Sequence, residues 1–299
     1  MSADQGSAAL SVTRLCKRFG RRDALADLSF AVPSGSICGL IGPNGAGKTT
    51  VMSILAGYLH ADSGSVDVLG LGAFDPIRHR GRVGILPQDA ELPPASTPRQ
   101  LLTIWARLQG LGREDARRAT DHVLATVQLT DRADTRVVTL SHGMRRRVTV
   151  ASALLGSPEL VLLDEPTSGL DPAQALHLRD CIAATRGSRS VLISSHNLAE
   201  LESICDHVVF IDKGHCTRSG LLTTVTGRDR EVSVRLAPPF PAGRAAMVTL
   251  TLPADDPRAI EDATSALLRQ LLDEGARIAE VRQGQSLERR FLADADGAA

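Results

Sequence analysis

Short apolar runs alternate with segments of helical periodicity along most of the chain. The runs predict strands at Ser11–Leu15, Leu28–Val32, Ile37–Ile41, Leu160–Leu163, Val191–Ser194 and Val208–Asp212. Leu160–Leu163 is apolar at every position, which is typical of a parallel strand covered on both faces. Helical patterns lie between the strands, at Ala173–Ala184 and Leu198–Cys205. This alternation predicts an α/β fold built on a parallel sheet.

Residues 88–139 have a different pattern, with prolines followed by two helix-like segments. The segments are Pro98–Leu108 and Gly112–Leu129. Glu114 and Asp115 lie in the first turn of the second segment, where the helix dipole favours acidic side chains. We predict a mostly helical subdomain, at about residues 88–139, inserted into the α/β core.

The pattern changes again after residue 226. Glu231–Leu236 and Met247–Leu252 alternate between apolar and polar positions and predict strands. Pro257–Glu274 carries apolar residues at helical spacing, and Gly275 is the expected end of that helix. We therefore predict a main domain at residues 1–226 and a small α/β accessory domain at residues 227–299.

The composition restricts the class of protein. Apolar residues make up 43% of the 299 residues, which is enough for a packed core. The 34 basic and 34 acidic residues cancel, and only 3% of residues are aromatic, so the chain lacks both the charge and the stacking surfaces of a nucleic-acid-binding protein. The five cysteines are scattered, which favours reduced thiols over a disulfide framework or a metal site. No apolar stretch is long enough to span a membrane, so we expect any membrane role to come through a partner.

One glycine-rich loop carries most of the chemical information. It fits G-x-x-x-x-G-K-[ST], the pattern of a loop that binds nucleotide phosphates, and consists of Gly42, Pro43, Asn44, Gly45, Ala46, Gly47, Lys48, Thr49 and Thr50. Glycines let backbone N–H groups approach a phosphate closely, and a helix starting at about Lys48 adds its positive dipole end. Lys48 can reach the phosphate oxygens, and the Thr49 hydroxyl suits Mg²⁺. A glycine-rich turn with an unrelated lysine is the alternative. The strand-like segment before the loop and the helix-like segment after it favour a nucleoside triphosphate site.

A second element with chemical meaning is the strand that ends in Asp164 and Glu165. Sheet geometry places Asp164 beside the phosphate loop, where it can hold Mg²⁺ through water. Glu165 follows it and can polarise the attacking water. Two acids closing a buried strand are costly unless a metal or hydrogen bonds offset them. The alternative is a strand that simply runs out into solvent.

Further motifs follow in a fixed order. They are Gln88, the segment Leu140–Arg146, the loop Ser168–Asp171 and His196. Together with the phosphate loop and the acidic strand, this ordered set, spanning about residues 11–220, resembles the ATP-binding cassette (ABC) ATPases. The resemblance implies a P-loop NTPase core of the ABC type with a helical subdomain, and the small C-terminal α/β domain is additional to it.

The resemblance also implies a role for each matching residue. Lys48, Gln88, Glu165 and His196 correspond to catalytic positions, and Thr49, Gln88 and Asp164 to Mg²⁺ ligands. Phe19 lies where the family stacks an aromatic ring on adenine, the alternative being an ordinary core aromatic. Ser141 and Gly143 are similar to the residues that complete the nucleotide site on a second cassette, and Asp171 of the aspartate loop is counted among the nucleotide-binding residues. A single copy is therefore expected to hydrolyse ATP poorly.

The segment at residues 140–147 departs from the family pattern L-S-G-G-Q. His142 replaces the first glycine and Met144 replaces the glutamine, whereas Ser141 and Gly143 are kept. We expect a working site. Residues 145–147 are all arginine, and we interpret them as a solvated helix face in preference to a docking surface, because charge runs are usually solvated.

The resemblance narrows the class of ABC protein. Members that repair or condense DNA carry a long coiled coil that does not fit between Lys48 and Ser141, and members that act on ribosomes generally have two cassettes in one chain. The remaining class is the ATPase subunit of a membrane transporter. Its implied partners are an integral-membrane permease and a second ATPase subunit, with a homodimer favoured and no nucleic acid. It would lie peripherally on the cytoplasmic face of the membrane.

The end of the chain refines this prediction. Residues 285–292 resemble the S-L-E-x-x-F-l ending of multidrug-type, ABC-2-type exporter subunits, including the daunorubicin-resistance kind. Leu287, Phe291 and Leu292 can equally be the apolar face of a terminal helix, and both interpretations can hold together. The alternative function is a soluble ABC-type ATPase with a regulatory or translation-associated role and no permease. An importer subunit is a weaker alternative.

Overall fold

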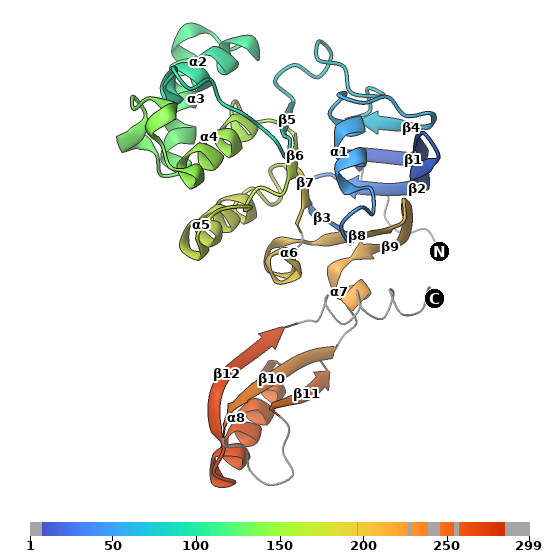
Figure 1. The fold of residues 1–299 in the computed structure, drawn as a ribbon, viewed down its shortest axis with the longest axis vertical. Coiled ribbons are helices and arrows are strands. Elements are labelled where there is room, and N and C mark those ends of the chain that lie inside the picture. The colour runs from blue at the N-terminus through green and yellow to red at the C-terminus, as the bar shows by residue number, and fades with distance from the viewer. Residues whose placement is uncertain (1–7, 196, 227–228, 239–245, 254–256, 285–299) are drawn as a thin grey trace. The chain divides into compact units, whose positions relative to one another are not determined.

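The structure is a computed structural model that describes residues 8–195, 197–226, 229–238, 246–253 and 257–284. The chain divides into two compact units, residues 1–220 and residues 221–299 (Figure 1). The predicted domain boundary after residue 226 remains a prediction.

A mostly parallel sheet forms the centre of the first unit. Its order is β5-β6-β7-β3-β8-β9, and its strands are β3 (Ile37–Ile41), β5 (Val83–Leu86), β6 (Leu160–Asp164), β7 (Ser190–Ser194), β8 (His207–Asp212) and β9 (His215–Leu221). The pairings from β5 across to β8 are parallel. Strands β3, β6 and β7 are buried along their whole length, which explains their unbroken apolar runs. The predicted α/β fold is confirmed.

A separate antiparallel sheet has the order β2-β1-β4, made of β1 (Ala8–Phe19), β2 (Arg22–Pro33) and β4 (Ser63–Val68). The predicted strands Ser11–Leu15 and Leu28–Val32 are parts of β1 and β2. Helix α1 (Lys48–Leu55) packs with both sheets, because Val51 and Leu55 share one buried core with residues of β1 and β6. The sheet carries Phe19 at the end of β1 and so brings an aromatic ring near the start of α1.

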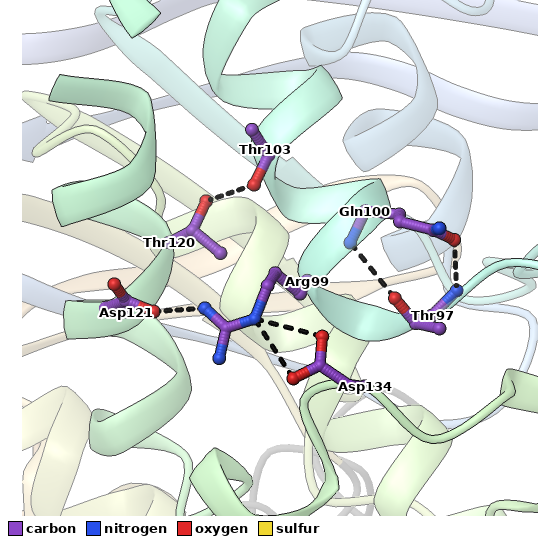
Figure 2. Close-up of polar contacts among 7 residues, drawn as sticks. All are labelled: Thr97, Arg99, Gln100, Thr103, Thr120, Asp121 and Asp134. Atoms are coloured by element: carbon purple, nitrogen blue, oxygen red, sulfur yellow. Dashed lines mark hydrogen bonds and ion pairs between the residues drawn. The ribbon is translucent and has the colours of Figure 1, made fainter. Parts of the chain in front are cut away.

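The helical segment contains α2 (Pro98–Leu108), α3 (Arg113–Thr126), the short 3-10 helices η1 (Thr130–Arg132) and η2 (Val137–Thr139), and α4 (His142–Leu154). The three α-helices lie together on the side of the parallel sheet away from the antiparallel sheet (Figure 1). The predicted helix Pro98–Leu108 is confirmed with its bounds, and the predicted Gly112–Leu129 is a shorter helix, α3. Thr97 begins α2 with a reciprocal capping box to Gln100 (Figure 2).

Polar contacts join α2 to α3 and to the chain that follows it. The Arg99 guanidinium donates to Asp121 of α3 and, at 3.1 Å, to Asp134 beyond η1 (Figure 2). The hydroxyls of Thr103 and Thr120 lie 3.2 Å apart, and Thr120 is completely buried. A buried hydroxyl needs such a partner, so this pair fixes how the two helices meet.

Helices α5 (Pro172–Ala183) and α6 (Leu198–Ile204) alternate with strands β6, β7 and β8, as predicted. The second unit begins with α7 (Leu222–Thr226) and contains an antiparallel sheet of order β11-β10-β12, with β10 (Asp229–Ala237), β11 (Met247–Pro253) and β12 (Arg277–Gly284). Helix α8 (Pro257–Asp273) contributes Leu271 to a core with Val232, Val234 and Leu236. The predicted ending at residues 285–292 lies outside the described residues. In the described part of the chain, no helix is long and apolar enough to span a lipid bilayer.

Helix α4 lies directly on strand β5 at Gly84. A Cβ atom added at Gly84 would lie 1.8 Å from the carbonyl oxygen of Ala153. Because backbone atoms on both sides meet there, Gly84→Ala must move α4 away from the sheet. We expect a loss of about 3 kcal/mol in the free energy of unfolding, measured by urea denaturation.

A matched control is Gly112→Ala, at the N-terminus of α3. There the new methyl group would meet only the tip of the Asp115 side chain, at 3.3 Å, so the loss should stay under about 1 kcal/mol. Equal losses for the two variants would contradict the close approach of α4 to β5.

Candidate nucleotide-binding site

The glycine-rich loop connects β3 to α1 in a conformation that only small residues allow. A Cβ atom at Gly42 would lie 2.3 Å from the Ile211 carbonyl oxygen, and one at Gly47 would lie 2.7 Å from that of Ala24. Gly47 has a φ of 112° and caps α1 without a side-chain bond. The first N–H groups of α1 therefore face the loop, in an arrangement suited to an anion.

Lys48 lies inside this loop and is only 8% exposed. Its ammonium donates to the carbonyl oxygens of Gly42 at 2.7 Å and Pro43 at 3.2 Å. Burial lowers the pKa of Lys48, while the nearby carboxylates of Glu165 and Asp164 act in the opposite direction. The loop thus holds a desolvated cation, which strengthens its attraction for a phosphate group.

A cavity of about 560 Å³ opens beside the loop. Its lining includes most of the predicted nucleotide-site residues: Phe19, Asn44, Gly45, Gly47, Lys48, Thr49, Thr50, Gln88, Asp164 and Glu165. Gly42, Pro43 and Ala46 belong to the loop but do not line the cavity. Phe19 is 52% exposed, so it is not a core aromatic, and the Lys17 ammonium lies 5.7 Å from the centre of its ring. The open ring can accept a flat apolar group.

The two acids at the end of β6 differ in their surroundings. Asp164 is 2% exposed and accepts a hydrogen bond from the Ser194 hydroxyl. Burial raises the pKa of Asp164, the neighbouring Glu165 raises it further, and Ser194 and Lys48 partly offset the effect. Glu165 is half-buried, with a left-handed φ of 51°, and its N–H donates to the Ser194 carbonyl and hydroxyl oxygens at 3.2 and 3.0 Å. The strand does not run out into solvent, so that alternative is wrong.

Three oxygen-bearing side chains meet at one side of the cavity. The Thr49 hydroxyl donates to the Gln88 amide oxygen at 3.1 Å, and Thr49 also interacts with the Asp164 carboxyl group. A hydroxyl, an amide oxygen and a carboxylate are ligands that Mg²⁺ prefers, and phosphate and water oxygens can complete its shell. The donor set therefore fits Mg²⁺.

Ser141 and Gly143, predicted to act across the interface, and Asp171, predicted to bind nucleotide, do not line this cavity. The Ser141 side chain caps α4 by accepting from the Met144 N–H at 3.2 Å, and Asp171 caps α5 by accepting from the Gln174 N–H at 2.9 Å. Gly143 packs close to Gln174, whose amide oxygen lies 2.8 Å from the position of a Cβ on the glycine. None of the three predicted residues lines the 560 Å³ cavity. The contact of Ser141 and Gly143 with a nucleotide of a second chain stays a prediction, and so does the nucleotide contact of Asp171. His196 lies outside the described residues.

Comparison with known proteins identifies the family. The ABC transporter family matches residues 25–168. The linearmycin resistance ATP-binding protein LnrL of Bacillus subtilis is 34% identical over 222 residues, which cover 73% of this chain and 71% of the relative. The chain belongs to the ABC transporter family.

Further relatives and solved structures agree with this assignment. The Nod factor export ATP-binding protein I of Burkholderia orbicola is 40% identical over 210 residues, covering 68% of each chain. An ATP-binding subunit of an ABC transporter superposes with a TM-score of 0.67 at 28% identity, covering 73% of this chain and 91% of the other. A dimeric cassette bound to ADP and Pi has the same fold, with a TM-score of 0.66 at 20% identity, covering 71% and 98%.

The predicted ABC ATPase fold and the predicted nucleotide-binding, ATP-hydrolysing subunit are therefore confirmed. The relatives carry names of resistance and export proteins, which agrees with the exporter prediction and gives no support to the soluble alternative.

The prediction of a solvated helix face at residues 145–147 of this ABC ATPase is wrong for Arg146 and Arg147. Arg146 and Arg147 are each only 8% exposed, and their guanidinium groups donate to backbone carbonyl oxygens rather than facing solvent. The apolar residues that follow, such as Val148 and Val150, are also buried. That adjacent apolar run was the available sign that this part of α4 lies inside the protein.

Three further residues of the ABC ATPase line the 560 Å³ cavity but were not predicted as site residues: Arg22, Ala24 and Ser168, the last of which begins the predicted aspartate loop. The Arg22 guanidinium donates to the Gly45 carbonyl oxygen at 3.2 Å. Arg22 lies three residues after Phe19 in a basic stretch. Its closeness in sequence to the predicted adenine-stacking residue was the available sign that it lies near the phosphate loop. Gly169, next to Ser168, lies against the ring of His142, whose Nε2 would be 2.5 Å from a Cβ at Gly169. The unusual histidine thus packs on the aspartate loop of its own chain.

The raised pKa of Asp164 gives a prediction about stability in the nucleotide-free protein. A carboxyl group whose pKa is higher in the folded state contributes most to stability below its unfolded pKa of about 4, and this contribution is lost as the pH rises through the folded pKa. Asp164→Asn is neutral at every pH and can still accept from Ser194. We expect a higher melting temperature than wild type at pH 7 and a smaller difference at pH 4.5.

Asp62→Asn is a control of opposite sign. The pKa of Asp62 is lowered, chiefly by a hydrogen bond from Lys17, so its contribution is present above the unfolded pKa and is lost as the pH falls. At pH 7 this variant should melt slightly lower than wild type. If Asp164→Asn also melts lower at pH 7, the cost assigned to the buried Asp164 charge is wrong.

Proposed function

We propose that this protein is the ATPase subunit of an ABC-2-type exporter, in which two copies close around two ATP molecules and drive a separate integral-membrane permease. The observation that carries the proposal is the division of the predicted site. Lys48, Asp164 and Glu165 line one cavity, whereas Ser141 and Gly143 lie on a different part of the same unit. The separation of these two sets supports a dimer in which Ser141 and Gly143 of the second chain complete the nucleotide site.

ATP binding is assigned to the phosphate loop and Phe19. The triphosphate lies against the loop N–H groups and the start of α1, with Lys48 turning from its own loop carbonyls to the phosphate oxygens. Phe19 stacks on the adenine through its exposed face. Arg22, which already contacts Gly45, adds a positive charge at the rim. These groups bind the nucleotide within one chain.

Hydrolysis is assigned to the end of β6. Thr49, Gln88 and Asp164 would hold Mg²⁺, which neutralises charge on the phosphate oxygens when bound. The Glu165 carboxylate orients the attacking water and accepts its proton, and the bonds that the Glu165 N–H donates to Ser194 hold this residue in its left-handed conformation. His196 is proposed to contact the γ-phosphate, as the resemblance implies.

The second copy supplies the remaining contacts. Ser141 offers a hydroxyl and Gly143 an N–H group at the start of α4, where the helix dipole favours the γ-phosphate of the partner. The 13-residue helix α4 belongs to the helical segment, so closing of the dimer would move α2, α3 and α4 together. The permease, and with it the peripheral position on the cytoplasmic face of the membrane, is proposed from the relatives' roles and from the resemblance of residues 285–292 to exporter subunits.

Ser141→Ala should separate the two halves of the site. Because Ser141 lies outside the cavity of its own chain, we expect ATP binding to dilute protein to stay within about threefold of wild type, while hydrolysis falls about tenfold or more. The variant also loses an N-cap, at about 1 kcal/mol. Ser141→Thr, which keeps a hydroxyl and the cap, is the matched control and should keep most activity. If Ser141→Ala lost ATP binding while Ser141→Thr kept it, a site shared between two chains would be contradicted.

The transporter assignment is tested by purification from membranes. The protein is tagged at its natural level, the membranes are dissolved in a mild detergent, and the bound partners are identified by mass spectrometry. An exporter subunit should keep a multi-span membrane protein, and ATPase activity of the purified complex should respond to that protein's removal. Recovery of ribosomes or only soluble partners would overturn the proposal in favour of the regulatory alternative.

A further inference from the structure

The buried guanidinium of Arg146 contacts the ends of two functional segments. Arg146 lies in the second turn of α4, and its Nη2 donates to the carbonyl oxygens of Asp164 at 2.8 Å and Glu165 at 2.7 Å. Its Nε lies 3.4 Å from the Pro166 carbonyl oxygen, and its Nη1 donates to that of Gln88 at 3.2 Å. The Arg146 side chain thus donates hydrogen bonds to carbonyl oxygens at the end of the acidic strand and in the loop that contains Gln88.

The hydrogen bonds from Arg146 fix the backbone carbonyl groups of Asp164 and Glu165. Glu165 has a left-handed φ of 51°, which a residue with a Cβ adopts only when its surroundings enforce it. Its N–H is fixed by Ser194, and the carbonyls of Asp164 and Glu165 are fixed by Arg146. The two side chains together determine the direction in which the Glu165 carboxylate leaves the backbone.

The chemistry of this position requires arginine. A guanidinium group has five donors in a rigid plane and can meet several carbonyl oxygens at once, whereas a lysine ammonium is a compact charge on a flexible stem. Burial lowers the pKa of Arg146, and the carboxylates of Asp164, Glu165 and Asp89 act against that effect. The guanidinium stays charged at any physiological pH.

We propose that Arg146 is a positioning residue for ATP hydrolysis, which fixes the backbone of Glu165 and joins it to the Gln88 loop and to helix α4. Arg146 does not line the 560 Å³ cavity but lines a second cavity of about 670 Å³, which shares Gln88 and Ser168 with the first. Its proposed action on Glu165 runs through the backbone carbonyl groups that it holds. Because α4 begins at His142, beside Ser141, the same helix carries the group offered to the partner's nucleotide at one end and holds Glu165 one turn later. This inference rests on the proposed role of Glu165.

The test compares arginine variants on one helix. Arg146→Lys and Arg146→Met remove the multiple carbonyl bonds, and Arg147→Met is the matched control. Arg147 is as buried as Arg146, but its Nη1 donates to the carbonyls of Val127 and Gln128, away from the site. Steady-state ATP hydrolysis, affinity for a fluorescent ATP analogue and melting temperature are measured for each full-length variant.

We expect both Arg146 variants to bind ATP with an affinity within about threefold of wild type and to have a kcat about 100-fold lower, because a misplaced catalytic group costs rate rather than binding. Arg147→Met should melt lower but keep its kcat per folded molecule. A kcat for Arg146→Lys within about threefold of wild type, or an equal loss of kcat in Arg147→Met, would overturn the proposal.

A second measurement separates positioning from a merely structural role. In the Glu165→Gln background, single-turnover hydrolysis should fall by no more than about threefold when Arg146→Lys is added, because the group that Arg146 positions is already gone. A further 100-fold fall would show that Arg146 acts independently of Glu165. If Glu165→Gln hydrolyses ATP like wild type, the proposed role of Glu165 is wrong. If Glu165→Gln loses hydrolysis but both Arg146 variants hydrolyse ATP at the wild-type rate, only the inference about Arg146 is wrong.

Discussion

Glu165→Gln should reduce ATP hydrolysis by about 1,000-fold while leaving ATP binding intact, since a positioned general base contributes rate and not affinity. The substitution removes the proton-accepting carboxylate but keeps the size of the side chain. The backbone bonds of residue 165 to Ser194 and Arg146 do not involve the side chain and are kept. ATP-bound protein should therefore accumulate as a closed dimer, detectable by size-exclusion chromatography with Mg²⁺ and ATP.

Glu159→Gln is the control for this prediction. Glu159 directly precedes the same strand, pairs with Arg82 at 2.5 Å and does not line the 560 Å³ cavity, so its hydrolysis rate should be that of wild type. Undiminished hydrolysis in Glu165→Gln would remove this residue from its role. A dimer that forms equally well without nucleotide would contradict closure around ATP.

Lys48→Met should weaken ATP binding by about 100-fold, which corresponds to about 3 kcal/mol, the upper end of what a charge-assisted hydrogen bond contributes. The Lys48 ammonium is the cation placed within the phosphate loop, where its bonds to Gly42 and Pro43 also brace the loop. Equilibrium titration with a fluorescent ATP analogue measures the effect.

The same substitution should leave the fold intact. Burial lowers the pKa of Lys48, which means that the folded protein pays a desolvation penalty for this charge. Removing the charge relieves that penalty, so the melting temperature of nucleotide-free Lys48→Met should stay within about 3 °C of wild type. Lys17→Met, at the rim near Phe19, should retain most of its ATP affinity. Normal ATP binding by Lys48→Met would exclude the loop as the phosphate site.

The inferred role of Arg146 links the site that contains Lys48 and Glu165 to the surface that is proposed to contact the second protomer. Lys48 and Glu165 lie in one cavity, but the helix that holds Glu165 in place begins at the residues proposed to meet the partner's nucleotide. In the proposed mechanism, engagement of one nucleotide can therefore influence the alignment of the catalytic acid for the other through α4. The Ser141 and Arg146 variants test the two ends of this connection separately.

The sequence by itself determined the features whose geometry is local. The phosphate loop is one contiguous motif between a buried strand and a helix, and Lys48 makes its bonds to Gly42 and Pro43 within the loop itself. The strands Ile37–Ile41 and Leu160–Asp164 and the helix Pro98–Leu108 were equally readable, because full burial and helix capping leave direct patterns in the residues. The ordered motifs then indicated the family without any knowledge of contacts.

The tertiary structure decided what depends on packing between distant segments. Strands β1 and β2 form a separate antiparallel sheet, which leaves Phe19 exposed at the cavity rather than in the core. The arginines at 146 and 147 have the same composition as a solvated face. They are buried because carbonyl oxygens of β6, the Gln88 loop and the end of α3 converge on that side of α4. A charged residue can be buried only where distant partners satisfy it, and a single sequence does not show which partners the fold brings together.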